Sequence, residues 1–298
     1  MPTVGKVYRR ERRADRGTYP RLCGRWQKFA RSKWTFLVFH LLLVWFCFIT
    51  EVHLASALLV WFVMQLGIHA GYHRYFSHRS FRTSSWFELL LGCAGCLAFQ
   101  NGPLWWVSKH RRHHQCADTG GDLHSPTQGF WHSHIGWLWE KEADDIDWQL
   151  IPDLLRPIPI WVERRQAWIH GIYVSTIFLM GQWDSLLNWW IMPLVLCWHT
   201  TFATNSICHT LGSHPYPCRP HSACQARNNF FVALANLGEG WHNNHHTNPS
   251  CCHHGFYRWY QLDIVFGVLL VLEQLGIVWE LKRKKKSWPP AALTFTSP

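Results

Sequence analysis

The sequence WTFLVFHLLLVWFCFIT (residues 34–50) is followed, after four residues, by ASALLVWFVMQLGIHA (residues 55–70), and neither stretch contains a charged side chain. Two further uncharged apolar stretches lie at Trp168–Gly181 and Leu186–Thr204. Long apolar stretches without charge are typical of membrane-spanning helices. Because crossing a bilayer takes roughly 20 residues, we expect flanking Trp and His residues to extend these short stretches into the membrane interface.

The basic residues indicate how these stretches are oriented. All 29 lysines and arginines fall in three blocks, Lys6–Lys33, Arg74–Arg165 and Arg219–Lys286. Two helical hairpins would place every basic residue on one side of a bilayer, because the outer turns, Glu51–Ser56 and Gln182–Asn188, contain no Lys or Arg. This is the positive-inside pattern. It predicts an all-α, multi-pass integral membrane protein of four transmembrane helices, with both termini and the polar segments in the cytoplasm.

Composition agrees with a membrane protein. The chain has 21 Trp residues, and indole rings favour the membrane–water boundary. Its net charge of +11 would suit nucleic acid or an anionic membrane surface. A nucleic-acid-binding protein has no reason to exclude basic residues from these stretches, so we expect membrane lipids and no nucleic acid as partners. A soluble helical bundle is the alternative, because buried helices can also be apolar all round.

Three regions are expected along the chain. Residues 1–33 form a basic cytoplasmic arm, residues 34–280 a single domain that contains a cytoplasmic helical cap, and residues 281–298 a basic tail. The apolar segment Leu262–Val278 is predicted to be an interfacial helix, since a fifth span would carry the lysines of Lys282–Lys286 to the outside.

Smaller features are interpreted as packing elements. Trp86–Phe99 is too short to span and is expected to pack on the bundle or dip into the membrane, with Cys93 and Cys96 as small packing residues. A further helix is predicted at Gln225–Leu237. The 11 cysteines show no regular disulfide framework, so we expect reduced thiols. Cys251–His254 is interpreted as a loop rather than a metal cluster.

The histidines carry the chemistry. Four groups follow the apolar stretches and fall on the predicted cytoplasmic side, and two of them share the spacing i, i+3, i+4 that places three side chains on one helical face. The groups are His73 with His78, His110 with His113 and His114, Asn205 with His209, and His242 with His245 and His246.

So many neutral imidazoles at one depth indicate metal. Buried ring nitrogens need partners, and protonated neighbours would repel one another. Divalent ions relieve both problems, and nine nitrogens are too many for one ion, so two ions are implied. A structural zinc site would want four ligands, usually including Cys. Imidazole also suits iron, and iron can perform oxygen chemistry.

The motifs HxxxxH, HxxHH and ExxHxxHH resemble those of the membrane fatty-acid desaturases, in particular the stearoyl-CoA (acyl-CoA) Δ9-desaturases. The similarity extends over roughly residues 36–280, including the strip Gly129–Trp137 and the Asn-Ser-x-x-His of Asn205–His209. Any one motif is weak, whereas all three in this order and separation are specific.

The resemblance implies a diiron centre, with one iron also contacting an asparagine through water. The matching positions are His73, His78, His110, His113, His114, His209, His242, His245 and His246, with Asn205 as the water-mediated partner. All nine histidines are present.

It also implies a reaction. The enzyme would use O₂ and two electrons to insert a cis double bond, at Δ9, into a saturated fatty acyl thioester or lipid, and would release water. Electrons would come from a separate carrier, cytochrome b5 or a ferredoxin, attracted by the basic face. The membrane would be the endoplasmic reticulum in a eukaryote or the inner membrane in a bacterium.

The resemblance further implies an acyl tunnel. Asn101 and Trp106 match positions near its mouth and its bend, Thr201 matches a bend residue, and Trp61 falls at its closed end. A lipid-facing role for Trp61 is the alternative.

The headgroup site departs from the animal enzymes. Where they place Arg and Asp before the second motif, this chain has Ser108 and Lys109, and where they have Arg-Lys it has Lys141 and Glu142. An acyl-CoA, acyl-lipid or acyl-carrier substrate is therefore open. The candidates for binding a phosphate group are Lys109, Arg111, Arg112 and Lys141.

Three acidic residues beside the motifs, Asp118, Asp122 and Glu239, are expected either to orient His rings or to be ordinary surface groups, and His69 is a further candidate for a supporting role. The other histidines of the apolar stretches and turns are interpreted as packing residues. These are His40, His53, His170 and His199.

Two rival functions stay open. A lipid hydroxylase or sterol oxidase uses the same kind of His-rich diiron site, and product analysis separates it from a desaturase. A divalent-metal transporter would need polar groups inside the spans, and no acidic residue lies within the four apolar stretches.

Overall fold

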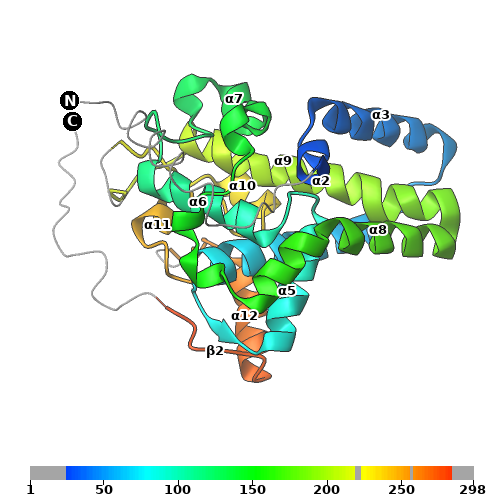
Figure 1. The fold of residues 1–298 in the computed structure, drawn as a ribbon. Coiled ribbons are helices and arrows are strands. Elements are labelled where there is room, and N and C mark those ends of the chain that lie inside the picture. Colours follow the sequence, from blue (N-terminus) through cyan, green and yellow to red (C-terminus); the bar gives the residue numbers. More distant parts are fainter. Residues whose placement is uncertain (1–24, 219–222, 256–257, 284–298) are drawn as a thin grey trace.

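The computed structural model of the protein describes residues 25–218, 223–255 and 258–283. The described chain is mainly helical (Figure 1). Its one named sheet pairs β1 (Arg82–Thr83) antiparallel with β2 (Val278–Trp279), with Arg82 opposite Trp279. The all-α prediction is confirmed at this level.

Both helices of the first predicted hairpin are present. Helix α3 (Lys33–Ile49) is capped by the side chain of Ser32, which accepts a hydrogen bond from the Thr35 backbone. Helix α4 (Leu54–Leu66) continues without a break into η1, a π-helix at Gly67–Ser77. This continuous helix, longer than the predicted stretch at residues 55–70, is the one described helix long and apolar enough to cross a membrane.

The second hairpin consists of α8 (Pro157–Leu186) followed by η7 (Leu187–Ile191) and α9 (Met192–Ser206). The chain leaves helical geometry only at Gly181 and Gln182, so the predicted outer turn Gln182–Asn188 was too long. Asn188, the last residue of that predicted turn, lies in η7. Its amide accepts a hydrogen bond from the His53 backbone (2.6 Å) and donates to the Glu51 carbonyl (2.8 Å), which ties the two outer turns together.

Shorter helices surround these hairpins. Those longer than one 3₁₀ turn are α2 (Arg25–Ala30), α5 (Ser85–Leu97), α6 (Pro103–Cys116), α7 (Phe130–His134), α10 (Phe230–Ala235), α11 (His242–Thr247) and α12 (Ile264–Gln274). The 3₁₀ segments are η2 (Pro126–Gln128), η3 (Gly136–Trp139), η4 (Lys141–Ala143), η5 (Trp148–Leu150), η6 (Pro152–Leu154) and η8 (Ile207–His209).

Two predicted helices are shorter than expected. The helix predicted at Gln225–Leu237 is reduced to α10, because the backbone of Asn228 forms isolated β-bridges with Ser213 and Trp241 and is extended there. The predicted interfacial helix at Leu262–Val278 is reduced to α12, since Asp263 caps its start and the chain reverses at Gly276, with φ of 69°.

Part of the predicted basic arm is folded. In α2 the ring of Trp26 packs edge-on against Phe99 at 5.2 Å, and the Gln27 side chain donates a hydrogen bond to Glu163 (3.2 Å). Residues 1–24 and most of the predicted tail, including Lys284–Lys286, lie outside the described residues.

Helix η1, which carries His73 of the first histidine motif, packs closely against α5. A Cβ on Gly67 would lie 2.4 Å from the Ala94 backbone, and one on Gly95 would lie 2.2 Å from the ring of Tyr72. Cys96 is buried here beside the Tyr72 hydroxyl (3.2 Å), so this cysteine packs between helices as expected.

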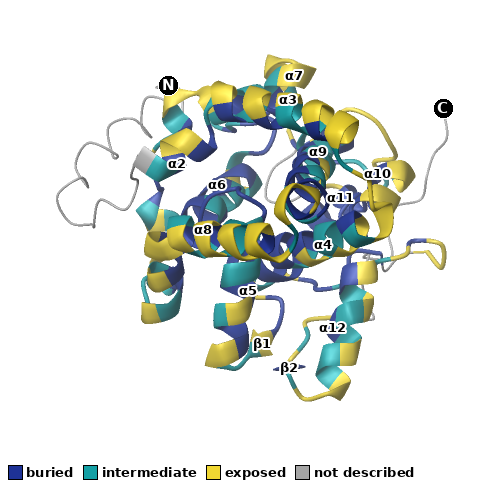
Figure 2. Ribbon diagram, turned by 90° about the vertical axis from the view of Figure 1, so that its right-hand side faces the viewer, coloured by how far each residue is buried: buried dark blue, intermediate teal, exposed yellow. Residues whose placement is uncertain are grey.

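Exposed residues run along α3 and α8 (Figure 2), and many of them are large apolar residues. Phe48, Leu179 and Trp168 expose 84%, 83% and 73% of their surface. Soluble monomers rarely expose large apolar patches, so this concentration of exposed apolar residues on α3 and α8 favours lipid contact over a soluble bundle.

A buried carboxyl group ties α8 to the start of α6. Glu163 accepts hydrogen bonds from the backbone N–H groups of Leu104 (2.8 Å) and Trp105 (3.3 Å), at the helix end that carries the second histidine motif. Burial raises the pKa of Glu163 to about 7 despite these bonds. The fold therefore favours the protonated carboxyl group of Glu163. This group contributes its full stabilisation at pH values below the unfolded pKa of about 4.5, and that contribution is lost as pH rises through the folded pKa of about 7.

We therefore expect Glu163→Gln to be more stable than the wild type above neutral pH. The amide keeps an acceptor for the α6 backbone and carries no charge. Thermal unfolding in detergent should show a Tm about 4 °C above wild type at pH 8 and little difference at pH 4.5. A Tm difference independent of pH would show that the fold does not raise the pKa of Glu163.

Candidate metal centre

Four elements bring the predicted histidines together. His73 lies in η1 and His78 directly follows it, α6 carries three histidines, α11 carries three more, and His209 ends η8 after α9. Helical spacing places the α6 and α11 rings on one face of each helix. All nine sort into two groups whose ring nitrogens converge.

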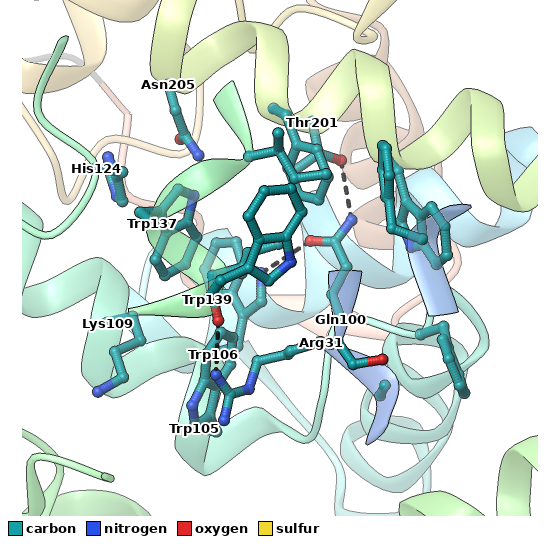
Figure 3. Close-up of a pocket in the computed structure, with 18 of the residues that line it drawn as sticks. Arg31, Gln100, Trp105, Trp106, Lys109, His124, Trp137, Trp139, Thr201 and Asn205 are labelled. Carbon is teal, nitrogen blue, oxygen red and sulfur yellow. Dashed lines mark hydrogen bonds between the residues drawn. The ribbon is translucent and has the colours of Figure 1, made fainter. Parts of the chain in front are cut away.

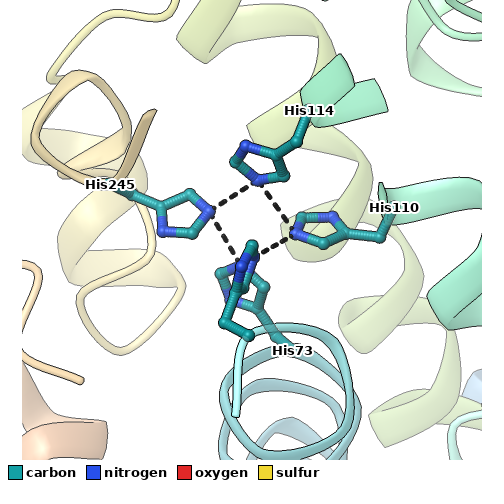
Figure 4. Close-up of side chains that lie close together, drawn as sticks. His73, His110, His114 and His245 are labelled. Carbon is teal, nitrogen blue, oxygen red and sulfur yellow. Dashed lines mark hydrogen bonds between the residues drawn. The ribbon is translucent and has the colours of Figure 1, made fainter. Parts of the chain in front are cut away.

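The five-histidine group contains members from η1, α6 and α11, and four of them are labelled in Figure 4. Its members are His73, His78, His110, His114 and His245. Consecutive Nε2 atoms lie 2.8 Å (His78–His110), 3.1 Å (His110–His114), 2.8 Å (His114–His245) and 3.0 Å (His245–His73) apart.

The four-histidine group lies beside it and is buried at every member. It consists of His113, His209, His242 and His246. Their Nε2 atoms lie 3.2 Å (His113–His246), 3.0 Å (His246–His242) and 3.0 Å (His242–His209) apart. The two groups abut where the rings of His114 and His246 stack at 4.3 Å.

These separations fit bound metal. Two nitrogens at a right angle, each about 2.1 Å from one ion, lie about 3.0 Å apart. Burial lowers the pKa of His78, His110, His114, His242 and His245 well below the ordinary value, with further lowering from neighbouring imidazoles. These five rings are therefore neutral, which is the form that binds metal.

Carboxylates fix the orientation of three of the rings. His73 donates from Nδ1 to Glu239 (2.8 Å), His113 to Asp122 (3.0 Å) and His209 to Asp118 (2.8 Å). A proton on Nδ1 leaves the Nε2 lone pair free to face the centre. The three acidic residues therefore orient His rings, and the surface alternative is wrong.

An arginine supports one of these carboxylates. Arg74, fully buried in η1, donates to Glu239 (2.9 Å), to Asp263 (2.9 Å) and to the carbonyl of Cys252 (2.6 Å). His69 donates from Nε2 to the side-chain oxygen of Asn236 (2.8 Å) and lies 4.0 Å from Glu239, so it belongs to the surroundings of the centre.

Two further histidines touch the centre that sequence reasoning missed. His124 packs its ring 4.3 Å from that of His113 and lies 3.8 Å from Asp122. His254 is fully buried, 4.6 Å from the ring of His245 and 3.3 Å from Glu239. The spacing Asp122-x-His124 was the signal for the first. His254 belongs to Cys251–His254, which is a loop as predicted. Among the described residues, this loop contributes no side chain to a cluster that could bind metal.

An apolar pocket of about 720 Å³, its open mouth included, reaches the centre (Figure 3). His110 lines it, and Asn205 and His124 lie together at one side. Several aromatic residues form its walls. They include Phe36, Phe99, Trp105, Trp106, Trp137 and Trp198.

Two of the four predicted tunnel residues line this pocket. Gln100 links them, because it accepts from the Trp106 indole (3.3 Å) and donates to Thr201 (3.3 Å). Asn101 is buried with φ of 66° and is not among the lining residues. Trp61 also lies outside the lining, and its indole N–H is 3.5 Å from the Thr200 hydroxyl.

Sequence comparisons agree with this arrangement. The family described as Fatty acid desaturase matches residues 51–269. The chain belongs to the fatty acid desaturase family. It is 34% identical over 289 residues to an sn-2 palmitoyl-lipid 9-desaturase of Nostoc sp. (strain 36), covering 94% of this chain and 96% of the relative.

Two other relatives show the range of the family. A probable chloroplastic lipid desaturase of Arabidopsis thaliana is 37% identical over 230 residues, which cover 74% of this chain and 61% of the relative. An icosanoyl-CoA 5-desaturase of Limnanthes douglasii is 34% identical over 271 residues, which cover 85% and 75%. As a member of this family, the chain is an oxidoreductase that desaturates fatty acyl chains.

Most of the cations predicted for the desaturase headgroup site are engaged inside the protein. Lys109 is buried and donates to the carbonyls of Glu142 (3.2 Å) and Asp145. Arg111 donates to Asp153 (2.6 Å) and three backbone carbonyls, and Arg112 donates to the Gly121 carbonyl (2.9 Å). Lys141 alone of the four is exposed.

The remaining histidines lie away from both groups. His40 and His199 approach through their Nε2 atoms (2.9 Å), and the His170 ring accepts from the Trp190 indole (3.0 Å). His53 is exposed at the outer turn. None of these belongs to either histidine group, which agrees with the packing interpretation.

Proposed function

We propose that this chain is an O₂-dependent Δ9 acyl desaturase that holds two iron ions, one in each histidine group. The observation that carries the proposal is the sorting of nine imidazoles into two converging groups beside an apolar pocket. Bound iron would supply the O₂-derived oxidant that removes hydrogen from an unactivated methylene.

The protein's own residues position the acyl chain and exclude water. The ring of Trp106, in the pocket wall, stacks on the ring of His110 at 5.0 Å, so the wall is in direct contact with a proposed iron ligand. An acyl chain lying against this indole would present one carbon–carbon unit to the centre. Asn205 lines the pocket four residues before His209, and in this proposal it would hold a water for the second ion, as the family resemblance implies.

The proposed substrate is a saturated acyl chain esterified to a lipid. Lys109, Arg111 and Arg112 are engaged within the fold, which leaves few of the predicted cations to bind the phosphates of CoA. The near full-length match to an sn-2 palmitoyl-lipid 9-desaturase supports both the lipid ester and the Δ9 position. We retain Asn101 and Trp61 as proposed tunnel-mouth and tunnel-end residues, and Lys141 as the exposed headgroup contact.

Electrons would enter on the side of the five-histidine group. His78, His110 and His114 are only half-buried, whereas all four members of the other group are buried. Exposed Arg79 directly follows His78. A basic side chain at this position would attract an acidic carrier such as cytochrome b5 or a ferredoxin.

The proposed topology keeps four membrane helices, residues 34–280 as the desaturase domain, and the active site in the cytoplasm. The outward apolar faces of α3 and α8 and the pinned outer turns support two hairpins. His73 and His209 follow the second and fourth of these helices in sequence, so the proposed topology assigns the histidine groups to the same side as the basic residues.

Expression in a desaturase-deficient host tests the function. We expect a new cis monoene, absent from the empty-vector strain, with its double bond at Δ9. When the host is given a labelled saturated fatty acid, the labelled monoene should appear in membrane glycerolipid rather than first in acyl-CoA. Mass spectrometry of the separated lipid pools measures both. A hydroxylated acid would instead make the chain a hydroxylase. An unchanged lipid profile from folded, iron-loaded protein supplied with a carrier would overturn the proposal.

A further inference from the structure

Two thiols lie against the metal centre in a small cluster of their own. Ala117, Cys218, Cys224 and Ala226 form a buried group separate from the main core. Cys218 and Cys224 are 8% and 3% exposed, and both sulfurs approach the backbone of Ala226. The two sulfurs and His246 Nδ1 all lie within 4.8 Å of one another.

One of these sulfurs performs the task that carboxylates perform elsewhere in the centre. Cys224 Sγ lies 3.4 Å from Nδ1 of His246, while Nε2 of the same ring faces the four-histidine group. His113 and His209 in that group have an aspartate at Nδ1. His246 therefore depends on a sulfur for its orientation, and that sulfur has a second thiol beside it.

We propose that Cys218 and Cys224 are a reversible oxidation site that peroxide closes to a disulfide. The proposal rests on the proposed metal function only for its effect on activity. When the thiols are reduced, Cys224 accepts the Nδ1 proton of His246 and holds the ring. When the disulfide forms, the Cys224 sulfur moves toward Cys218, and His246 loses its partner.

The chemistry is balanced with hydrogen peroxide as the oxidant. One thiol attacks peroxide, so its sulfur is oxidised to a sulfenic acid and one water leaves. The second thiol then attacks that sulfur, an S–S bond forms, and the second water leaves. Two thiols and one peroxide thus give one disulfide and two waters, and a dithiol reductant reverses the change.

A disulfide accounts for the geometry better than a third metal site. Structural zinc takes four ligands, and the described residues offer three here. A metal on Nδ1 would also have to share one imidazole with the ion on Nε2. By contrast, two sulfurs within 4.8 Å and five residues apart in sequence need only a short approach to the bonding distance of about 2.05 Å.

The test uses the purified full-length chain, reduced, iron-loaded and then titrated with hydrogen peroxide. Free thiols are alkylated, and mass spectrometry identifies cross-linked peptides. We expect a Cys218–Cys224 disulfide and an activity loss of about tenfold, the size seen when a ligand loses its supporting partner. Dithiothreitol should restore both. Cys218→Ser should keep its activity and lose the reversible inhibition, whereas Cys251→Ser, at another buried thiol, should behave as wild type.

Three results would overturn the proposal. The first is the absence of a Cys218–Cys224 cross-link, and the second is reversible inhibition that persists in Cys218→Ser. The third is one zinc ion per chain that is lost in both Cys218→Ser and Cys224→Ser. Because the cross-link is read without turnover, a disulfide in a protein that makes no monoene would reject the proposed function and keep the oxidation site.

Discussion

Replacing His113 by alanine is expected to abolish desaturation and to remove one of the two iron ions proposed above. His113 joins the four-histidine group through Nε2, 3.2 Å from that of His246, and donates to Asp122 from Nδ1. Its loss leaves three imidazoles for one ion and removes the histidine donor of the buried Asp122 carboxylate, which then has the more distant His124 ring (3.8 Å) beside it. Loss of a supporting group alone costs about 10–100-fold in metal affinity or activity, so loss of the ligand should leave no measurable product.

Metal analysis distinguishes this outcome from unfolding. Because the five-histidine group contains no contribution from His113, the variant should retain about one iron ion per chain and elute as the wild type does in gel filtration. Loss of both ions with retained fold would mean that the groups bind metal as one unit. Undiminished monoene in the deficient host would remove His113 from the centre.

The matched control is His53→Ala. His53 is exposed at the outer turn, and its backbone N–H, rather than its ring, makes the contact with Asn188. This change removes an imidazole without touching either group, so product and iron content should equal those of wild type. A comparable loss in both variants would indicate a general defect in insertion or expression.

Much of the centre could be predicted because short-range spacing determines it. In His110–His114 and His242–His246 the helical repeat fixes which rings share a face, whatever surrounds them. The apolar stretches predicted α3, α4, α8 and α9 for the same reason. An uninterrupted run of apolar residues indicates a helix of this kind without any knowledge of contacts to distant segments.

What could not be predicted depends on contacts between distant segments. Asn188 looked like a turn residue until the backbone of the other outer turn was found to satisfy its amide. Arg111 looked free to bind a phosphate, but it is bound to Asp153, 42 residues away in sequence. The helix predicted at Gln225–Leu237 failed because the backbone of Asn228 pairs with Ser213 and Trp241. No local pattern records such pairings.

The second large effect is expected at Arg74. This side chain is completely buried and neutralises two buried carboxylates, Glu239 and Asp263, at 2.9 Å each. Arg74→Met fills a similar volume but removes the charge. Breaking a buried pair from one side costs about 3–5 kcal/mol, since the partner charge is left uncompensated. The Tm in detergent should therefore fall by about 10 °C, and the iron held by the five-histidine group should be lost first, because Glu239 orients His73.

Arg79→Met is the control that shows how much of the Tm loss at Arg74 is due to burial of the ion pair. Arg79 also pairs with a carboxylate, Asp153 at 2.7 Å, but 59% of its side chain is exposed. Exposed pairs contribute about 0–1 kcal/mol, so this variant should unfold within about 3 °C of wild type. Equal Tm values for the two variants would mean that the Arg74 network does not stabilise the fold. A large Tm loss at Arg74 with both iron ions retained would mean that Glu239 holds His73 without the arginine.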